Sequence, residues 1–190
     1  MRTSRVAYMQ VLADLVVDEL VVCGLGASAR YWKALRPRPE NFYLADSMGQ
    51  AIPVGLGVAL AQPARRVVVL EGDGAVLMNA GCLSTVASTG ATNLIVVIFN
   101  NDVYEASGGQ PLPAAPVDYA GLARASGLAL ATNLEGADAF RSALQKALKE
   151  PGPAFLCLRT AYLPDEPIPA YDMRPLETRL IFMQSLGVSI

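Results

Sequence analysis

The sequence of 190 residues contains no histidine and only three cysteines. The absence of histidine excludes Ser-His and Cys-His nucleophile pairs, imidazole general bases and the usual zinc ligands. Cys23, Cys82 and Cys157 lack CxxC spacing and stand among apolar residues, so we expect reduced thiols that serve packing. Chemistry in this protein must therefore use oxygen ligands or a bound cofactor.

An excess of charge of either sign is also missing. The 15 Lys and Arg residues nearly balance the 17 Asp and Glu residues, and the basic residues form no cluster. We therefore expect neither a nucleic-acid partner nor a membrane partner. The N-terminal segment has acidic side chains and no small-residue cleavage site, which indicates a helix and a strand of a cytoplasmic protein rather than a signal peptide.

Apolar side chains make up 53% of the chain, which is enough for a buried core within one domain. We predict that residues 1–163 form this domain and that residues 164–190 form an extended arm and a short helix. The arm and the Pro-rich segment 111–116 are apolar enough to contact another chain. We expect Leu112 to lie in such an interface.

Runs of Val, Ile, Leu and Phe alternate with helical patterns along the chain. The runs predict six buried strands, at residues 20–23, 42–44, 66–70, 93–99, 128–131 and 154–158. The other patterns predict helices at residues 3–17, 28–36, 49–61, 75–89, 118–126 and 135–149. This alternation predicts an α/β fold, a doubly wound and mainly parallel six-stranded sheet with helices on both faces.

Ligands of such a sheet bind at the carboxyl ends of its strands. The segment 24–28, which follows the first predicted strand, contains Gly26, Ala27 and Ser28 at the start of a helix. It lacks the third glycine of a dinucleotide fingerprint, but N–H groups at a helix start and the Ser28 hydroxyl suit a phosphate. We interpret this segment as a phosphate cradle.

Gly72, Asp73 and Gly74 follow the third predicted strand and open a helix, where glycines allow a tight turn beside a phosphate. One helix and one strand later the chain reaches Asn100 and Asn101. Adjacent parallel strands bring the carboxylate and the carboxamide to one edge, and both are hard oxygen ligands suited to Mg²⁺. Two side chains do not complete an octahedron, so the metal also needs phosphate oxygens.

The succession of strand, Gly-Asp-Gly, helix, strand and Asn-Asn, with 25 residues between Gly74 and Asn100, resembles the fingerprint of thiamine diphosphate (ThDP) enzymes. This resemblance implies the ThDP-binding fold, with ThDP and Mg²⁺ as cofactors. It also implies that Asp73, the side chain of Asn101 and the backbone carbonyl of Val103 bind the metal. Diphosphate oxygens and a water would complete the coordination.

The same resemblance implies the contacts of the cofactor itself. Met48 would be an apolar wedge beneath the bent cofactor, and the carbonyl of Asp46 would accept a hydrogen bond from its 4′-amino group. The implied cofactor contacts are Gly26, Ala27, Ser28, Asp46, Ser47, Met48, Gly72, Gly74, Ala75, Asn101 and Val103. The sequence departs from relatives at Gln50, where some carry histidine, and at Asp102, where glycine is common.

Within the family, residues 20–160 resemble in particular the sulfopyruvate and phosphonopyruvate decarboxylases, through segments 46–49, 59–81 and 100–111. The resemblance implies a ThDP- and Mg²⁺-binding subunit of an enzyme that decarboxylates a small 2-oxo acid without oxidation. The glutamate that activates the cofactor belongs to a pyrimidine-binding domain, for which this chain has no room. We therefore expect a separate pyrimidine-domain subunit to supply it, and we assign no catalytic residue to this chain.

The surface around Met48, Asp73 and Asn101 is accordingly expected to contact that subunit, and the isolated chain is expected to self-associate through the same face. Arg30 is the only basic residue beside a motif. Glu105 either faces substrate at the cofactor edge, or faces solvent or caps a helix. Two alternatives stay open: a subunit of another two-chain ThDP enzyme, acetolactate synthase-like or a 2-oxo acid oxidoreductase, or a non-catalytic ThDP-binding regulator.

Overall fold

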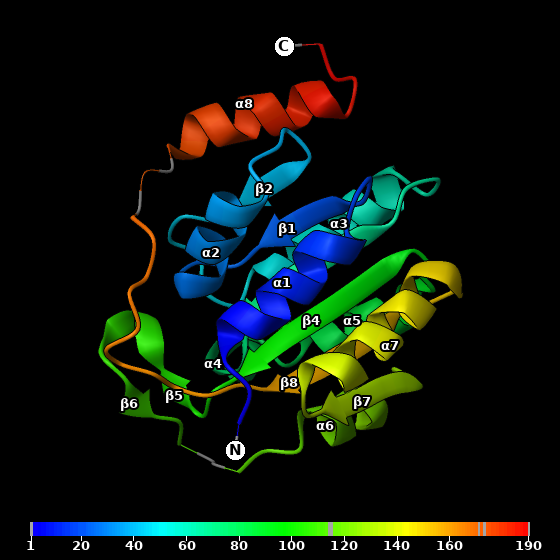
Figure 1. Ribbon diagram of the computed structural model, residues 1–190. Helices are drawn as coiled ribbons and strands as arrows, with labels where there is room; N and C mark the ends of the chain where they lie inside the picture. Colours follow the sequence, from blue (N-terminus) through cyan, green and yellow to red (C-terminus); the bar gives the residue numbers. More distant parts are fainter. Residues whose placement is uncertain (1, 114–115, 171, 173, 190) are drawn as a thin grey trace.

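A six-stranded sheet runs through the centre of the molecule (Figure 1). The computed structural model describes residues 2–113, 116–170, 172 and 174–189. The strands are β1 (Leu20–Cys23), β2 (Asn41–Tyr43), β3 (Val67–Gly72), β4 (Leu94–Asn100), β7 (Leu130–Leu134) and β8 (Ala154–Arg159). Their order is β2-β1-β3-β4-β8-β7, and every neighbouring pair is parallel. The six predicted strands and the predicted doubly wound sheet are confirmed, with small shifts at the strand ends.

Helices cover both faces of the sheet (Figure 1). α1 (Arg5–Leu15), α2 (Ala27–Leu35) and α7 (Ala137–Lys149) pack on one face, and α3 (Ala51–Ala61), α5 (Cys82–Thr89) and α6 (Tyr119–Ala125) pack on the other. Side chains alternate along a strand, so Leu20 and Val22 of β1 join one core while Val21 and Cys23 join the other. Burial on both faces explains why the central strands are apolar without interruption.

The winding of the chain leaves a crevice at the carboxyl ends of β1 and β3. From β1 the chain passes through α2 to β2 on one side, whereas from β3 it passes through α5, on the opposite face, to β4 on the other side. Two connections that leave neighbouring strands in opposite directions cannot fill the space between them, and ligands of open α/β sheets bind at this point.

The predicted helix at residues 75–89 is wrong as a single element. The structure has α4 (Asp73–Met78) and α5, separated by a turn at Asn79. Asn79 adopts a non-helical backbone, and its Nδ2 donates to the carbonyl of Gly49 at 2.9 Å. This tertiary hydrogen bond ties the end of α4 to the turn before α3, a contact that no local pattern reveals.

A short hairpin after β4 was also not predicted. It consists of β5 (Val103–Tyr104), a 3₁₀ turn (Glu105–Ser107) and β6 (Gln110–Pro111). Strands of two residues are too short to show alternating hydrophobicity, and Pro111 disfavours a strand assignment. The hairpin lies beside the crevice and therefore belongs to the functional edge.

The C-terminal arm returns along α2 to the β2 edge of the sheet (Figure 1). Tyr31 of α2 donates to the carbonyl of Pro167 at 2.9 Å, and the predicted final helix is present as α8 (Pro175–Ser185). Phe182 of α8 is buried against Phe42 of β2, with ring centroids 5.4 Å apart. The predicted division of the chain at residue 163 stays a prediction.

None of the helices in the described part of the chain is both long enough and apolar enough to cross a membrane.

The packing of α3 on β3 predicts unequal effects of two glycine substitutions in one helix. A β-carbon at Gly55 would lie 2.2 Å from Cγ2 of Val69, whereas one at Gly57 would meet no described atom within 4 Å. We expect Gly55→Ala to lower the free energy of unfolding by about 1–3 kcal/mol through overpacking. Gly57→Ala should be neutral or stabilising by up to about 1 kcal/mol, since alanine favours helix. Equal urea-unfolding midpoints for the two variants would contradict this packing.

Candidate functional site

A cleft of about 240 Å³ lies at the carboxyl ends of β1, β3 and β4. Its lining includes most of the residues implied by the sequence: Gly26, Ala27, Ser28, Met48, Gly72, Asp73, Gly74, Ala75, Asn101 and Val103. Asp46 and Ser47 are exposed and lie outside this lining. The structure thus brings together four segments, and at least one helix and one strand separate each from the next.

The cleft also has lining residues outside the cofactor and metal contacts that the sequence implied. They are Arg5, Leu25, Glu71, Phe99, Tyr104, Glu105, Ala106 and Ser107. Leu25, Glu71, Phe99 and Tyr104 adjoin the motifs, so proximity in the sequence could have suggested them. Arg5 comes from the N-terminal helix, and no motif signals it.

The turn after β1 forms the wall that can hold an anion. Gly26 precedes α2 with φ of 92°, and α2 begins at Ala27 with Ser28 buried in its first turn. The first N–H groups of a helix have no partner within the helix, and the helix dipole places positive potential there. Ala27 and Ser28, which carry these N–H groups, line the cleft, so this wall suits a diphosphate.

Asp73 is the carboxylate at the centre of the cleft, and its side chain is only 2% exposed. Its Oδ1 accepts from the Gly74 N–H at 2.9 Å, and its Oδ2 accepts from the Asp102 N–H at 2.7 Å. With its amide nitrogen facing the carboxylates, Asn100 donates to Oδ2 as well, at 3.0 Å. A carboxylate has about four acceptor positions, so these three donors leave one for a cation.

Burial raises the pKa of Asp73 to about 6, against the opposing effect of the backbone N–H donors. Burial likewise raises the pKa of Glu71 to about 7. Glu71 accepts from the Gly72 N–H at 3.0 Å and from the Ala51 N–H at 3.4 Å, and so joins β3 to the first residue of α3. A divalent cation beside Asp73 would compensate the cost of burying its charge.

Asn101 and Val103 present oxygens beside Asp73. Val103 donates its N–H to Oδ1 of Asn101 at 3.1 Å, which leaves that oxygen one acceptor position. In the hairpin, the carbonyls of Asp102 and Tyr104 accept from the N–H groups of Leu112 (3.1 Å) and Gly109 (2.9 Å). The carbonyl of Val103 lies between these two and opposite Pro111, which has no N–H, so the hairpin does not use it.

The backbone conformation of Asp102 lets the chain turn between Asn101 and Val103. Its φ of 63° is the left-handed conformation for which glycine is the usual residue. Aspartate is among the few other residues that adopt it readily. The carboxylate of Asp102 forms ion pairs with Arg2 and, at 3.5 Å, with Arg159, which hold the turn in place. The departure from glycine at this position therefore keeps the backbone geometry.

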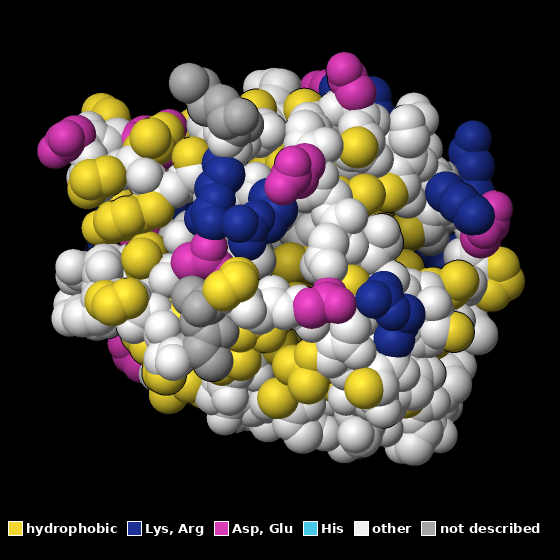
Figure 2. All heavy atoms as spheres, turned by 90° about the horizontal axis from the view of Figure 1, so that it is seen from below, with side chains coloured by type: hydrophobic (Ala, Val, Ile, Leu, Met, Phe, Trp, Pro, Cys, Tyr) yellow, Lys and Arg dark blue, Asp and Glu magenta, His cyan; other side chains and the backbone are white. Residues whose placement is uncertain are grey.

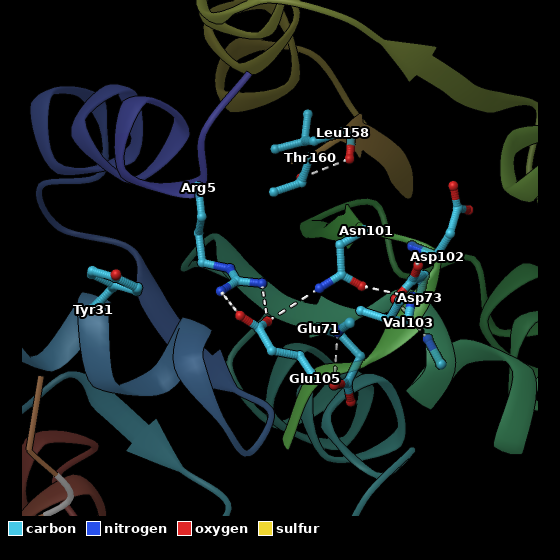
Figure 3. A network of polar contacts seen from close by, with 12 residues as sticks. Arg5, Tyr31, Glu71, Asp73, Asn101, Asp102, Val103, Glu105, Leu158 and Thr160 are labelled. Carbon is cyan, nitrogen blue, oxygen red and sulfur yellow. Dashed lines mark hydrogen bonds and ion pairs between the residues drawn. The ribbon is translucent and has the colours of Figure 1, made fainter. Parts of the chain in front are cut away.

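A buried ion pair joins the N-terminal helix to this turn (Figure 3). Arg5 is 5% exposed, and its Nη1 lies 2.9 Å from Oε1 of Glu105, while its Nη2 pairs with Oε2. Arg30 is the basic residue beside a motif in the sequence, and the structure adds Arg5, which lines the cleft from a distant part of the chain. Glu105 lies in the cleft wall rather than facing solvent or capping a helix.

Leu112 is 5% exposed and packs within this chain, so the prediction that it lies in an interface is wrong. Its Cδ2 lies 3.1 Å from the position that a β-carbon on Gly74 would take. Segment 111–116 is described only in part, since residues 114 and 115 lie outside the described residues.

Figure 2 shows the molecule from the side on which β5, β6 and the N-terminal segment lie. Hydrophobic side chains are spread over this face, and basic side chains gather there in a compact group beside acidic ones. Arg2 and Arg159 both form ion pairs with Asp102.

The Gly-Asp-Gly turn predicts unequal effects of substituting its two glycines. A β-carbon at Gly74 would lie 2.6 Å from Cε1 of Tyr104, whereas one at Gly72 would meet no described atom within 4 Å. Gly74→Ala should displace the Tyr104 ring and lower the free energy of unfolding by about 1–3 kcal/mol. Each kcal/mol corresponds to roughly 2–4 °C in Tm for a chain of this size. Differential scanning calorimetry without cofactor should find Gly72→Ala close to wild type, and a Gly74→Ala melt as high as that of Gly72→Ala would refute the contact.

Comparison with known proteins places this arrangement in a family. Residues 23–157 match the family described as thiamine pyrophosphate enzyme, C-terminal TPP binding domain. The chain is 36% identical over 177 residues to the sulfopyruvate decarboxylase subunit beta of Methanothermobacter thermautotrophicus, and the match covers 91% of this chain and 90% of that one. It is 39% identical over 158 residues to the phosphonopyruvate decarboxylase of Streptomyces viridochromogenes, covering 83% of this chain and 40% of that one.

Solved structures share the fold. Benzoylformate decarboxylase from Polynucleobacter necessarius superimposes with a TM-score of 0.75 over 87% of this chain and 34% of that one, at 21% identity. Such low identity speaks for the fold alone, whereas the family match spans the strands and turns that form the cleft. The chain therefore belongs to the thiamine pyrophosphate enzymes and carries their C-terminal, TPP-binding domain.

Proposed function

We propose that this chain is the ThDP- and Mg²⁺-binding subunit of an enzyme that decarboxylates a small 2-oxo acid of the sulfopyruvate or phosphonopyruvate type. One observation carries the proposal. Asp73, Asn101 and Val103 line one cleft, Asp73 and Asn101 each keep an oxygen acceptor outside the hydrogen bonds that hold them, and the hairpin does not use the carbonyl of Val103. The opposite wall of that cleft is the N-terminus of α2, which suits a diphosphate.

The composition of the metal site favours a metal that binds together with the cofactor. The described residues include no group of three or more His, Cys, Asp or Glu side chains suited to a metal ion. A site with one carboxylate, one carboxamide and one carbonyl is a weak ligand set for Mg²⁺, which requires near-octahedral oxygen coordination. The oxygens of the diphosphate supply the missing ligands and charge.

The residues of this chain bind and orient the cofactor. The amides of Ala27 and Ser28 hold the diphosphate, and Met48, which is half-buried in the cleft lining, supports the rings. Thiamine diphosphate, when bound, accepts the electrons released as the carboxylate of a 2-oxo acid leaves. Apolar cleft residues such as Leu25 and Phe99 exclude water from this region.

A second subunit completes the site in this proposal. The sulfopyruvate decarboxylase relative of similar length is named a beta subunit. The phosphonopyruvate decarboxylase relative is a longer chain, of which the region matched here is 40%. We infer that a pyrimidine-domain subunit contributes the remaining half of the site, including the activating glutamate, and that it docks on the face around Met48, Asp73 and Asn101.

Substitution of Asp73 tests the metal site. Asp73→Ala removes the charged ligand, so we expect Mg²⁺-dependent binding of ThDP to be lost while the fold is kept. Isothermal titration calorimetry on the complex with the pyrimidine-domain subunit measures the affinity, and circular dichroism checks the fold. The control is Asp18→Ala, an exposed aspartate before the amino end of β1, which should bind ThDP like wild type. Unchanged affinity in Asp73→Ala would rule out this metal site.

The requirement for a partner is tested by reconstitution. The purified chain alone should show no decarboxylase activity, because it lacks the activating glutamate, and addition of a pyrimidine-domain subunit should restore turnover. Carbon dioxide release from sulfopyruvate and phosphonopyruvate measures the activity. Turnover by a preparation that mass spectrometry finds free of other chains would overturn the two-subunit proposal.

A further inference from the structure

The ion pair of Arg5 and Glu105 lies where removing the two charges from water costs free energy. Packing alone does not require charged side chains at this position. Arg5 is the first residue of α1, where the helix dipole disfavours a cation, and its side chain is buried. Glu105 is 100 residues away in the sequence and sits at the start of the 3₁₀ turn. Buried ion pairs gain little net stability because both charges lose hydration. The net contribution of the pair to the stability of the fold is therefore small.

The carboxylate of Glu105 contacts both Arg5 and Asn101 (Figure 3). Its Oε2, which pairs with Nη2 of Arg5, also accepts from Nδ2 of Asn101 at 3.1 Å. The other end of the Asn101 amide, Oδ1, accepts from the Val103 N–H at 3.1 Å. A carboxamide turned by 180° would place Nδ2 against the N–H and Oδ1 against the carboxylate, so both contacts would become repulsive.

We propose that Arg5 and Glu105 are positioning residues that hold the Asn101 carboxamide with its oxygen toward the Mg²⁺ site. The inference rests on the proposed function, since Asn101 is the carboxamide ligand of that metal. Arg5 fixes the Glu105 carboxylate through two parallel hydrogen bonds, a geometry that arginine provides and lysine does not. Glu105 in turn fixes which end of the Asn101 amide faces the cleft.

Arg5 has a second role in the same arrangement. Glu105 lines the cleft that is to receive a diphosphate, and an unpaired carboxylate there would repel it. The guanidinium of Arg5 neutralises this carboxylate, so the orienting contact to Asn101 does not oppose cofactor binding. Removal of Arg5 alone should therefore be more harmful than removal of both charges together.

A set of four variants tests the inference. Arg5→Met and Glu105→Ala should each weaken Mg²⁺ binding in the presence of ThDP by about 10- to 100-fold, the usual effect of losing a residue that orients a metal ligand. Glu105→Gln keeps an oxygen that accepts from Asn101, so we expect a smaller loss than for Glu105→Ala. The double variant Arg5→Met with Glu105→Gln should bind more tightly than Arg5→Met alone. Calorimetric titration of Mg²⁺ into the complex with the pyrimidine-domain subunit, in the presence of excess ThDP, measures each affinity.

The control variant breaks another ion pair of the same helix. Asp14 of α1 pairs with Arg141 of α7 at 2.6 Å, away from the cleft lining. Asp14→Asn should leave Mg²⁺ affinity unchanged, which separates orientation of the ligand from anchoring of α1. With Mn²⁺ in place of Mg²⁺, the electron paramagnetic resonance spectrum should change in Arg5→Met and stay unchanged in Asp14→Asn, because only the former disturbs a metal ligand.

Two outcomes separate this inference from the proposed function. The positioning role is overturned if wild type binds Mg²⁺ and ThDP and the variants Arg5→Met and Glu105→Ala bind them equally well. Should wild type fail to bind them, the proposed function itself fails. Arg5→Lys serves if Arg5→Met does not fold: it keeps the charge but not the two parallel hydrogen bonds, and wild-type Mg²⁺ affinity in that variant would also overturn the inference.

Discussion

The parallel pairing of β3 with β4, in one register, is the constraint on which the functional edge depends. Gly72 pairs with Phe99 at the end of this ladder, so the next residues along the chain, Asp73 after β3 and Asn100 at the end of β4, lie at the same level of the sheet. A slip by one residue would turn every side chain of a strand to the other face and separate the two groups. The apolar cores on both faces prevent such a slip, because it would exchange their side chains. Packing of the core thus sets the geometry of the oxygen ligands.

The polar side chains of the site are each held in one orientation by hydrogen bonds to neighbouring residues. Asp73 is held by the amides of Gly74 and Asp102. Asn101 is held between Val103 and Glu105. These contacts settle rotamers before a ligand arrives, which reduces the entropy lost on binding. The hairpin contributes in the same way, since its hydrogen bonds leave the carbonyl of Val103 for a cation.

The cleft lies at the carboxyl ends of β1, β3 and β4. The walls of the cleft suit a diphosphate and its metal, and the two glutamates of its lining, Glu71 and Glu105, are each held by other groups of the chain. Glu71 accepts from two backbone N–H groups and joins β3 to α3. Its role in this chain is therefore structural support of the turn that carries Met48.

The sequence by itself determined the sheet and the motifs, because both depend on local order. A strand buried on two faces must be apolar throughout, and a turn that holds a phosphate needs Gly, Asp or Asn directly after the strand. Tertiary structure alone decided the rest. The pairing of Arg5 with Glu105, the burial of Leu112 and the break of the 75–89 helix at Asn79 all depend on contacts between segments distant in the sequence. Such contacts form only when helices and strands pack against each other. The periodic pattern of apolar residues in the sequence does not specify which residue a side chain contacts.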